Sequence, residues 1–161
     1  MTEQTSTDRT ADGERTRWAA GNADERPEER GEPPQVFDLK DLPFEVLLDG
    51  ALKRSALRSE NAFVNIIWIT PDIPYIPPHT HPEDQISFVL QGTAEFEIDG
   101  HRVVLEAPAA VHIPGHVPHT GWNIGDVDVL NVDVYAPARP DIAHLADHQG
   151  ELRPPAPDPN A

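Results

Sequence analysis

The sequence has no cysteine, few basic residues and no long apolar run, and each absence excludes a class of protein. Without cysteine there is no disulfide, no thiolate nucleophile and no cysteine-based zinc or iron–sulfur site. Twelve Lys and Arg against 28 Asp and Glu give a formal net charge of −16, which argues against binding of nucleic acid or an anionic membrane surface. No apolar stretch approaches the ~20 residues that span a bilayer, and the N-terminus lacks the features of a secretory signal. We therefore expect a cytoplasmic protein.

The composition divides the 161 residues into three parts. Residues 1–35 carry nine acidic and five basic residues and almost nothing apolar, which predicts a disordered acidic tail. The periodic apolar segments fall within residues 36–137, so we expect one folded domain there. For residues 138–161 we expect a loosely packed C-terminal segment, with a short helix between Asp141 and His148 followed by a mobile proline-rich tail.

Residues 36–137 have the pattern of a series of short strands. Thr93 to Ile98 alternates between apolar and polar residues, and Asp99-Gly100 predicts a hairpin turn after it. The apolar phase slips between Val129 and Leu130, which predicts a bulge or a strand buried on both faces. No window has a convincing helical period, so the pattern predicts an all-β, antiparallel sandwich or barrel. The expected strands cover 44–48, 62–69, 86–90, 93–98, 101–105, 111–113 and 127–135, with one more opening at residue 119.

Five of the eight histidines lie in two clusters, HTHPEDQ and VHIPGHVPHTGWN. His79 and His81 are two residues apart, so an extended strand directs both imidazoles to one face, about 6.6–7 Å apart along the strand. Glu83 and Gln85 keep the same parity, and a barrel could place His119 opposite the pair. Three imidazoles with open coordination positions are typical of a catalytic metal site, and imidazole nitrogen suits Fe, Zn, Ni, Cu or Mn.

The segments HTHPEDQISFVLQGTAEFEIDG and IPGHVPHTGWN resemble the two motifs of the cupin superfamily, within about residues 60–136. The resemblance is to small, single-domain, RmlC-like cupins of the type-2 conserved-barrel family, and it implies an antiparallel double-stranded β-helix, the jelly-roll barrel. It also implies one divalent transition metal ion, of Fe, Zn, Ni or Mn. The positions that match the first motif are His79, His81, Gln85 and Gly92, and those that match the second are Pro114, His116, His119 and Asn123. The implied metal ligands are His79, His81, Gln85 and His119.

The chain departs from the cupin pattern at four positions. Ile73 and Pro108 stand where the motifs often open with glycine, and His116 stands at a turn glycine, which predicts a positive φ for this histidine. Gln85 replaces a glutamate ligand, so a ligand set of three histidines and one glutamine is neutral. Such a set leaves the full charge of a divalent ion uncompensated and favours an anionic partner. The alternative is that the Gln85 amide only orients a histidine.

The resemblance implies a mononuclear metalloenzyme that acts on a small oxygenated organic acid or carbonyl compound, as a dioxygenase, isomerase, lyase or cyclase. Its partner would be a small anionic substrate, with Glu83 and His112 as candidate catalytic bases. The alternative is a non-catalytic small-ligand-binding or sensor cupin. We also expect a homodimer, because a small sandwich has exposed strand edges to cover.

Overall fold

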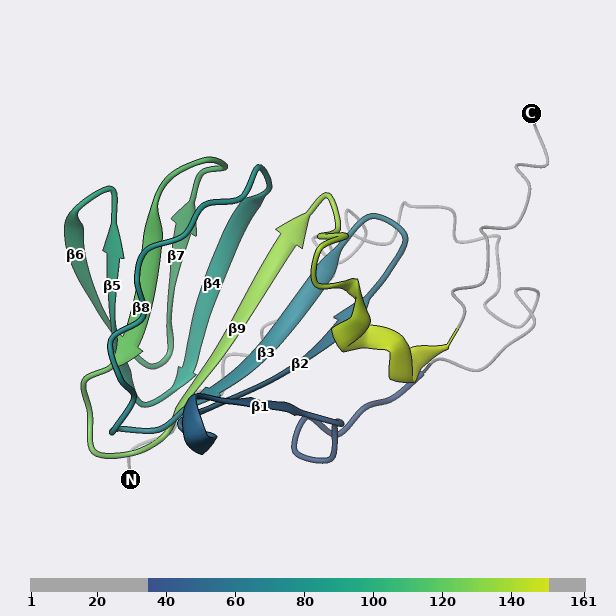
Figure 1. Ribbon diagram of the computed structural model, residues 1–161, viewed down its shortest axis with the longest axis horizontal. Coiled ribbons are helices and arrows are strands. Elements are labelled where there is room, and N and C mark those ends of the chain that lie inside the picture. The colour runs from purple at the N-terminus through teal and green to yellow at the C-terminus, as the bar shows by residue number, and fades with distance from the viewer. Residues whose placement is uncertain (1–34, 151–161) are drawn as a thin grey trace, which may run out of the picture. The chain divides into compact units, whose positions relative to one another are not determined.

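The computed structural model describes residues 35–150, and within them the strands form two antiparallel sheets (Figure 1). The six-stranded sheet has the order β1-β2-β3-β9-β4-β7, and the three-stranded sheet has the order β6-β5-β8. The elements are β1 (Glu45–Leu47), the short 3-10 helix η3 (Leu48–Gly50), β2 (Leu52–Arg58), β3 (Phe63–Ile69), β4 (Asp84–Gln91), β5 (Thr93–Ile98), β6 (His101–Glu106), β7 (Ala109–Ile113), β8 (His119–Asn123), β9 (Val129–Ala136) and the 3-10 helix η4 (Ala143–Gln149).

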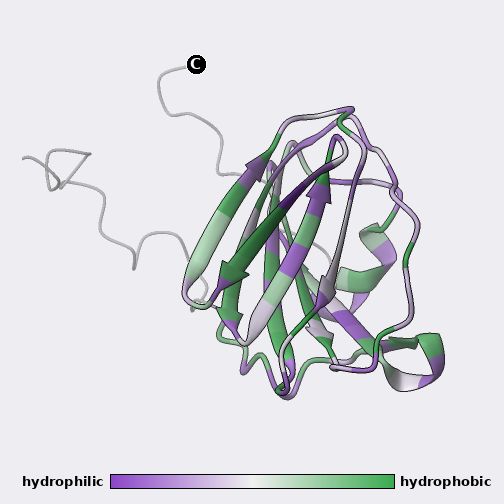
Figure 2. Ribbon diagram, turned by 90° about the vertical axis from the view of Figure 1, so that its left-hand side faces the viewer, coloured by the Kyte–Doolittle hydropathy of each residue, from purple (hydrophilic) through white to green (hydrophobic). Residues whose placement is uncertain are grey.

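The two sheets face each other and build the antiparallel double-stranded β-helix (Figure 2). The all-β fold expected from the strand pattern is thus confirmed. Every predicted strand is present, and the strand expected to open at His119 is β8. The apolar phase slips at Leu130 because β9 turns the polar Asn131 and Asp133 to the interior while its burial alternates without interruption, so β9 itself shows neither the expected bulge nor burial of both faces. The register shift lies in the neighbouring β4, between Val89 and Gln91.

Strand β2 was not expected from the sequence. Its residues LKRSALR do not alternate, since three polar residues follow one another and the consecutive Ser55 and Ala56 are both buried. The segment becomes a strand because β1 pairs with one of its edges and β3 with the other. Tertiary pairing here overrides a weak local pattern.

The interior between the sheets is apolar at one end and polar at the other. Along β4 the side chains of Gln85, Ser87 and Val89 are buried while their neighbours are exposed, as a period of two requires. Val89 belongs to the apolar cluster, whose members are Ile69, Val89, Ala94, Phe96, Leu105, Ile113 and Val129. Gln85 and Ser87 pair in register with Tyr135 and Asp133 of β9. This polar end of the interior carries the candidate site.

The segment after β9 packs against the sheet instead of being loose. The short helix expected near residues 141–148 is η4, and its Leu145 and Ala146 are buried against Ala56, Phe63 and Tyr135. The side-chain oxygen of Gln149 accepts a hydrogen bond from the backbone N–H of Arg58, 2.6 Å away. Apolar residues of η4 thus cover one end of the sheet. The expected tails fall mostly in 1–34 and 151–161, outside the described residues.

None of the helices within residues 35–150 is both long enough and apolar enough to cross a membrane.

Candidate metal centre

Backbone hydrogen bonds bring the two histidine motifs together. His79 and His119 exchange both backbone hydrogen bonds, with N···O distances of 2.9 and 3.0 Å. The turn before β8 is fixed to the first motif as well, because the N–H of His116 donates to the carbonyl of His81 at 2.7 Å. His116 has a φ of 66°, which confirms the positive φ expected at this position. A β-carbon on Gly115 would overlap the carbonyl oxygen of Pro82, so glycine permits this close approach.

This backbone arrangement clusters the three imidazoles of His79, His81 and His119. One nitrogen from each ring lies within 4.8 Å of the other two. The ring centroids are 4.5 Å apart for His79 and His119, 4.9 Å for His81 and His119, and 5.8 Å for His79 and His81. His81 and His119 are buried, and His79 forms the exposed edge of the cluster. The fold therefore places His119 opposite the first pair, and the three rings could together hold a metal ion.

Two of these rings have their protons fixed by backbone carbonyls. Nδ1 of His81 lies 3.0 Å from the carbonyl oxygen of Glu83, and Nδ1 of His119 lies 2.8 Å from that of Val117. A carbonyl oxygen only accepts, so we assign the proton to Nδ1 in both rings. With the proton on Nδ1, each ring directs Nε2 and its lone pair to the cluster, and a lone pair is what a metal ion requires.

Gln85 adds an oxygen atom to the same place. Its Oε1 lies 3.0 Å from Nε2 of His81 and 3.1 Å from Nε2 of His119. Its amide nitrogen instead donates to Oγ of Ser87 at 2.7 Å. Three lone-pair atoms thus face one another with no proton between them, an arrangement that is repulsive unless a cation lies among them. The donor set fits a divalent metal ion.

Desolvation lowers the pKa of two of the candidate ligands, His79 and His119. Desolvation, helped by the charges of His119, His81 and Arg139, lowers the pKa of His79 to about 4. Burial also lowers the pKa of His119. Both imidazoles are therefore neutral at pH 7 and able to bind a metal ion without releasing a proton.

Comparison with known proteins agrees with this geometry. A family model described as a cupin domain matches residues 69–135, which include both histidine motifs. Residues 69–135 therefore form a cupin domain. No curated protein matches it in sequence.

Solved structures with the same fold come from several organisms. An RmlC-like cupin from Shewanella frigidimarina is 25% identical, with a TM-score of 0.57 over 68% of this chain and 96% of the other. KdgF from Halomonas sp. is 23% identical, with a TM-score of 0.58 over 67% of this chain and 99% of the other. A predicted oxalate decarboxylase from Thermotoga maritima is 18% identical, with a TM-score of 0.56 over 64% and 99%.

A buried hydrogen-bond network lies behind the glutamine of this cupin site. Oγ of Ser87 donates to Oδ1 of Asp133 at 2.6 Å, and the amide nitrogen of Asn131 donates to the same oxygen at 2.7 Å. The hydroxyl of Tyr135 donates to Oδ2 of Asp133 at 3.4 Å. Burial raises the pKa of Asp133, while these hydrogen bonds oppose the shift. Sequence reasoning missed this network because its members come from two different strands.

A charged group borders the cluster on another side. Oε2 of the buried Glu83 lies 3.6 Å from Nδ1 of His81 and 3.9 Å from Nε of Arg139. The guanidinium of Arg139 also binds Asp141 with two nitrogens, and its carbon lies 5.1 Å from the centre of the Tyr135 ring. Arg139 was not expected from the sequence, because it falls in the segment that looked loose.

His112 does not face the cluster. It is exposed and pairs in register with Ile86, which is also exposed, whereas the adjacent Ile113 is fully buried. The sequence offered His112 as a candidate catalytic base, but the alternation of the strand directs it to the outer face, while apolar neighbours fill the interior.

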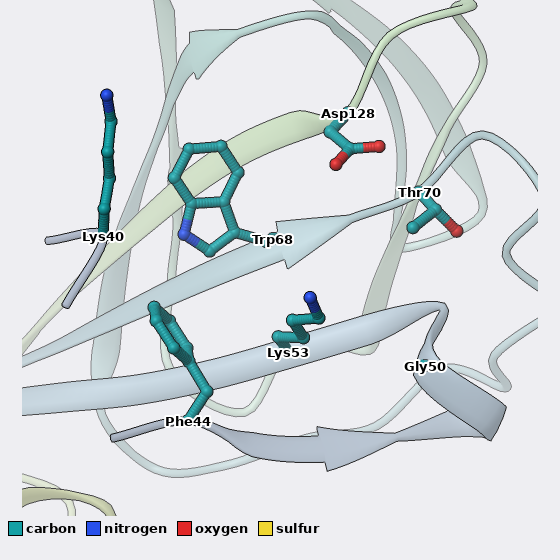
Figure 3. Close-up of a pocket in the computed structure, with 7 residues that line it drawn as sticks. All are labelled: Lys40, Phe44, Gly50, Lys53, Trp68, Thr70 and Asp128. Carbon is teal, nitrogen blue, oxygen red and sulfur yellow. The ribbon is translucent and has the colours of Figure 1, made fainter. Parts of the chain in front are cut away.

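A separate pocket of about 300 Å³ lies on the outer face of the six-stranded sheet (Figure 3). Lys53 and Trp68, which pair in register across β2 and β3, contribute to it. Trp68 points away from its neighbours Ile67 and Ile69, which pack on the core. The pocket shares no residue with the histidine cluster; its lining is Lys40, Phe44, Gly50, Lys53, Trp68, Thr70 and Asp128.

Proposed function

We propose that this cupin is a mononuclear divalent-metal enzyme that acts on a small, anionic, oxygenated organic acid or carbonyl compound. The observation that carries the proposal is the convergence of unprotonated Nε2 atoms of His81 and His119 on Oε1 of Gln85. In the proposed centre His79, His81 and His119 hold the ion, and Gln85 is the fourth ligand. The bound ion would be a transition metal such as Fe, Zn, Ni or Mn, which imidazole nitrogen suits.

The proposed reaction class follows from the charge of the site. Three histidines and a glutamine carry no charge, so a divalent ion bound there would act as a strong Lewis acid toward a carboxylate or enolate oxygen. This charge favours a small anionic substrate. The buried Arg139 adds no net positive charge, because the carboxylates of Asp141 and Glu83 both lie beside its guanidinium.

Glu83 is the group that we propose as proton acceptor. Its carboxylate is buried beside His81, and Oε2 has no hydrogen-bond partner among residues 35–150. The Arg139 guanidinium, 3.9 Å away, supplies charge but no hydrogen bond. A buried acceptor without a hydrogen bond is costly, and a substrate proton would satisfy it. His112 has no part in the proposal because it lies on the outer face of the sheet.

The similarity to solved structures supports the fold, and one relative suggests the substrate class. The protein from Thermotoga maritima is described as a predicted oxalate decarboxylase, an activity on a small carboxylic acid. At 18% identity this likeness shows the fold alone. The transfer of the substrate class to this chain is part of our proposal.

A panel of small dicarboxylic, keto and enolic acids tests the activity. The full chain, loaded in turn with Fe(II), Zn(II), Ni(II) and Mn(II), should consume at least one of them. His119→Ala should abolish this turnover, Glu83→Gln should reduce it without loss of metal, and the exposed His112→Ala should leave it unchanged. Saturable binding of these acids without turnover under any metal would instead indicate a ligand-binding or sensor cupin.

A further inference from the structure

We propose that Ser87 and Asp133 are positioning residues that fix the orientation of the Gln85 amide, so that its oxygen faces the histidines. This inference rests on the proposed metal centre. It assigns a role to the buried network behind the site, which lies outside the set of metal ligands.

The direction of the hydrogen bonds starts from Asp133. Both oxygens of Asp133 act as acceptors, Oδ1 toward Ser87 and Asn131 and Oδ2 toward Tyr135, so Ser87 donates its single hydroxyl hydrogen to Oδ1 of Asp133 at 2.6 Å. The lone pairs of the Ser87 oxygen therefore face Gln85, 2.7 Å away. Only the NH₂ end of the amide can satisfy them, and this leaves Oε1 of Gln85 on the side of His81 and His119.

The amide of Asn131 is also oriented by Asp133. Asn131 directs its NH₂ group to Oδ1 of Asp133, and its own Oδ1 has no hydrogen-bond partner among the described residues. Leaving a buried carbonyl oxygen unpaired costs free energy. The carboxylate thus sets the orientation of Asn131 directly and that of Gln85 through Ser87.

A glutamine ligand needs neighbours that fix its orientation. The oxygen and the NH₂ group of its amide are similar in size, but the oxygen accepts hydrogen bonds and the NH₂ group donates them. Without it, rotation of the amide would let the NH₂ group donate to Nε2 of His81 or His119, and would occupy the lone pairs that a metal ion needs. Gln85, Ser87 and Asp133 are all at most 4% exposed, so water has little access to compensate for a wrong orientation. A glutamate at position 85 would need no orienting group, since both of its ends are oxygens.

The variant Asp133→Asn tests the role of the carboxylate. It keeps the shape of the side chain but replaces one acceptor oxygen with an NH₂ donor. The asparagine can donate to Ser87, which can then donate to Oε1 of Gln85 and turn the amide around. We expect zinc affinity of the full chain, measured by chelator competition, to fall about tenfold or more. The melting temperature of the metal-free protein should stay equal or rise, because a desolvated carboxylate has been removed. A lower melting temperature with unchanged zinc affinity would indicate a structural role only and would overturn the proposal.

Ser87→Ala in two backgrounds tests the orientation itself. With Gln85 present, Ser87→Ala should weaken zinc binding about tenfold, within the range for partners of metal ligands. With Gln85→Glu, either end of the side chain offers an oxygen, so the same substitution should change zinc affinity less than about twofold. Equal weakening in both backgrounds would overturn the positioning role.

The outcomes separate this inference from the proposed function. A wild-type chain that binds no zinc, or a His119→Ala variant that binds as tightly, overturns the metal centre and the positioning role together. A wild-type chain that binds zinc through His119, with Ser87→Ala and Asp133→Asn binding equally well, overturns the positioning role alone.

Discussion

His79 and His119 are joined by two backbone hydrogen bonds, and their rings lie with centroids 4.5 Å apart. The pair connects the loop before β4 to the start of β8, so the candidate ligands and the pairing of these segments depend on each other. A metal ion bound by both imidazoles should therefore stabilise the fold as well as the site.

The first prediction concerns this stabilisation. Zinc at about 100 times its dissociation constant should stabilise the full chain by about 2.7 kcal/mol, or roughly 10 °C in melting temperature for a domain of this size. Differential scanning calorimetry with and without chelator measures the shift. His119→Ala should abolish it, whereas the exposed His116→Ala should retain it. A shift of the same size in both variants would mean that zinc acts elsewhere.

The second prediction concerns pH. Burial lowers the pKa of His79 to about 4, whereas the ordinary value is 6.5. Between these values the unfolded chain binds a proton that the folded, metal-free chain does not, so His79 makes stability rise with pH across this window, and its contribution is lost as the pH falls through 4. NMR titration of the metal-free protein should place the His79 midpoint well below 6.5. A midpoint at or above 6.5 contradicts the desolvation of this ring by its neighbours and the effect of the nearby charges of His119, His81 and Arg139.

The third prediction concerns the charge of the ligand set. Gln85→Glu places an anionic oxygen beside the ion and lowers the net charge of the loaded site from +2 to +1. Metal affinity should increase by at least about tenfold. Two unit charges about 4 Å apart attract each other by about 4 kcal/mol at an effective dielectric constant of 20, and the cost of desolvation offsets part of this energy. Binding of acetate to the loaded protein should weaken. Titration calorimetry measures both, and weaker metal binding by the variant would contradict ligation through Gln85.

The fourth prediction concerns the turn that holds the two motifs together. Gly115→Ala places a β-carbon against the carbonyl oxygen of Pro82, so the turn has to move away from His81. We expect a loss of about 2 kcal/mol or more in stability and a weaker metal site. Gly125→Ala is the matched control, because its β-carbon would meet the nearest atom at an ordinary 3.5 Å. Equal urea-unfolding free energies for the two variants would contradict the close approach.

The strands other than β2 and the three histidines were predictable because each depends on local spacing. Apolar alternation identified β5, and the two-residue spacing of His79 and His81 predicted that their rings share a face. The motif residues added His119, which the fold brings to the same place.

The remaining features depend on contacts between distant residues. Ser87 and Asp133 are 46 positions apart, and Asp133 alternates with apolar residues as a solvent-facing position would. Arg139 lies beside Glu83 only because the segment leading to η4 packs against the sheet. The outward direction of His112 could not be predicted for a related reason: which face of β7 is interior depends on the facing sheet.

The homodimer stays a prediction. Strand β4 exposes an apolar row on its outer face that a second copy of the chain could cover. The row consists of Ile86, Phe88 and Leu90.

Metal content after purification tests the central claim most directly. Elemental analysis of the full chain should find about one divalent transition metal ion per chain in the wild type and in His116→Ala, and much less in His119→Ala. The two variants remove the same ring from neighbouring positions, but only His119 directs Nε2 toward Gln85. Equal metal content in His119→Ala and His116→Ala would contradict the assignment of this cluster as the metal centre.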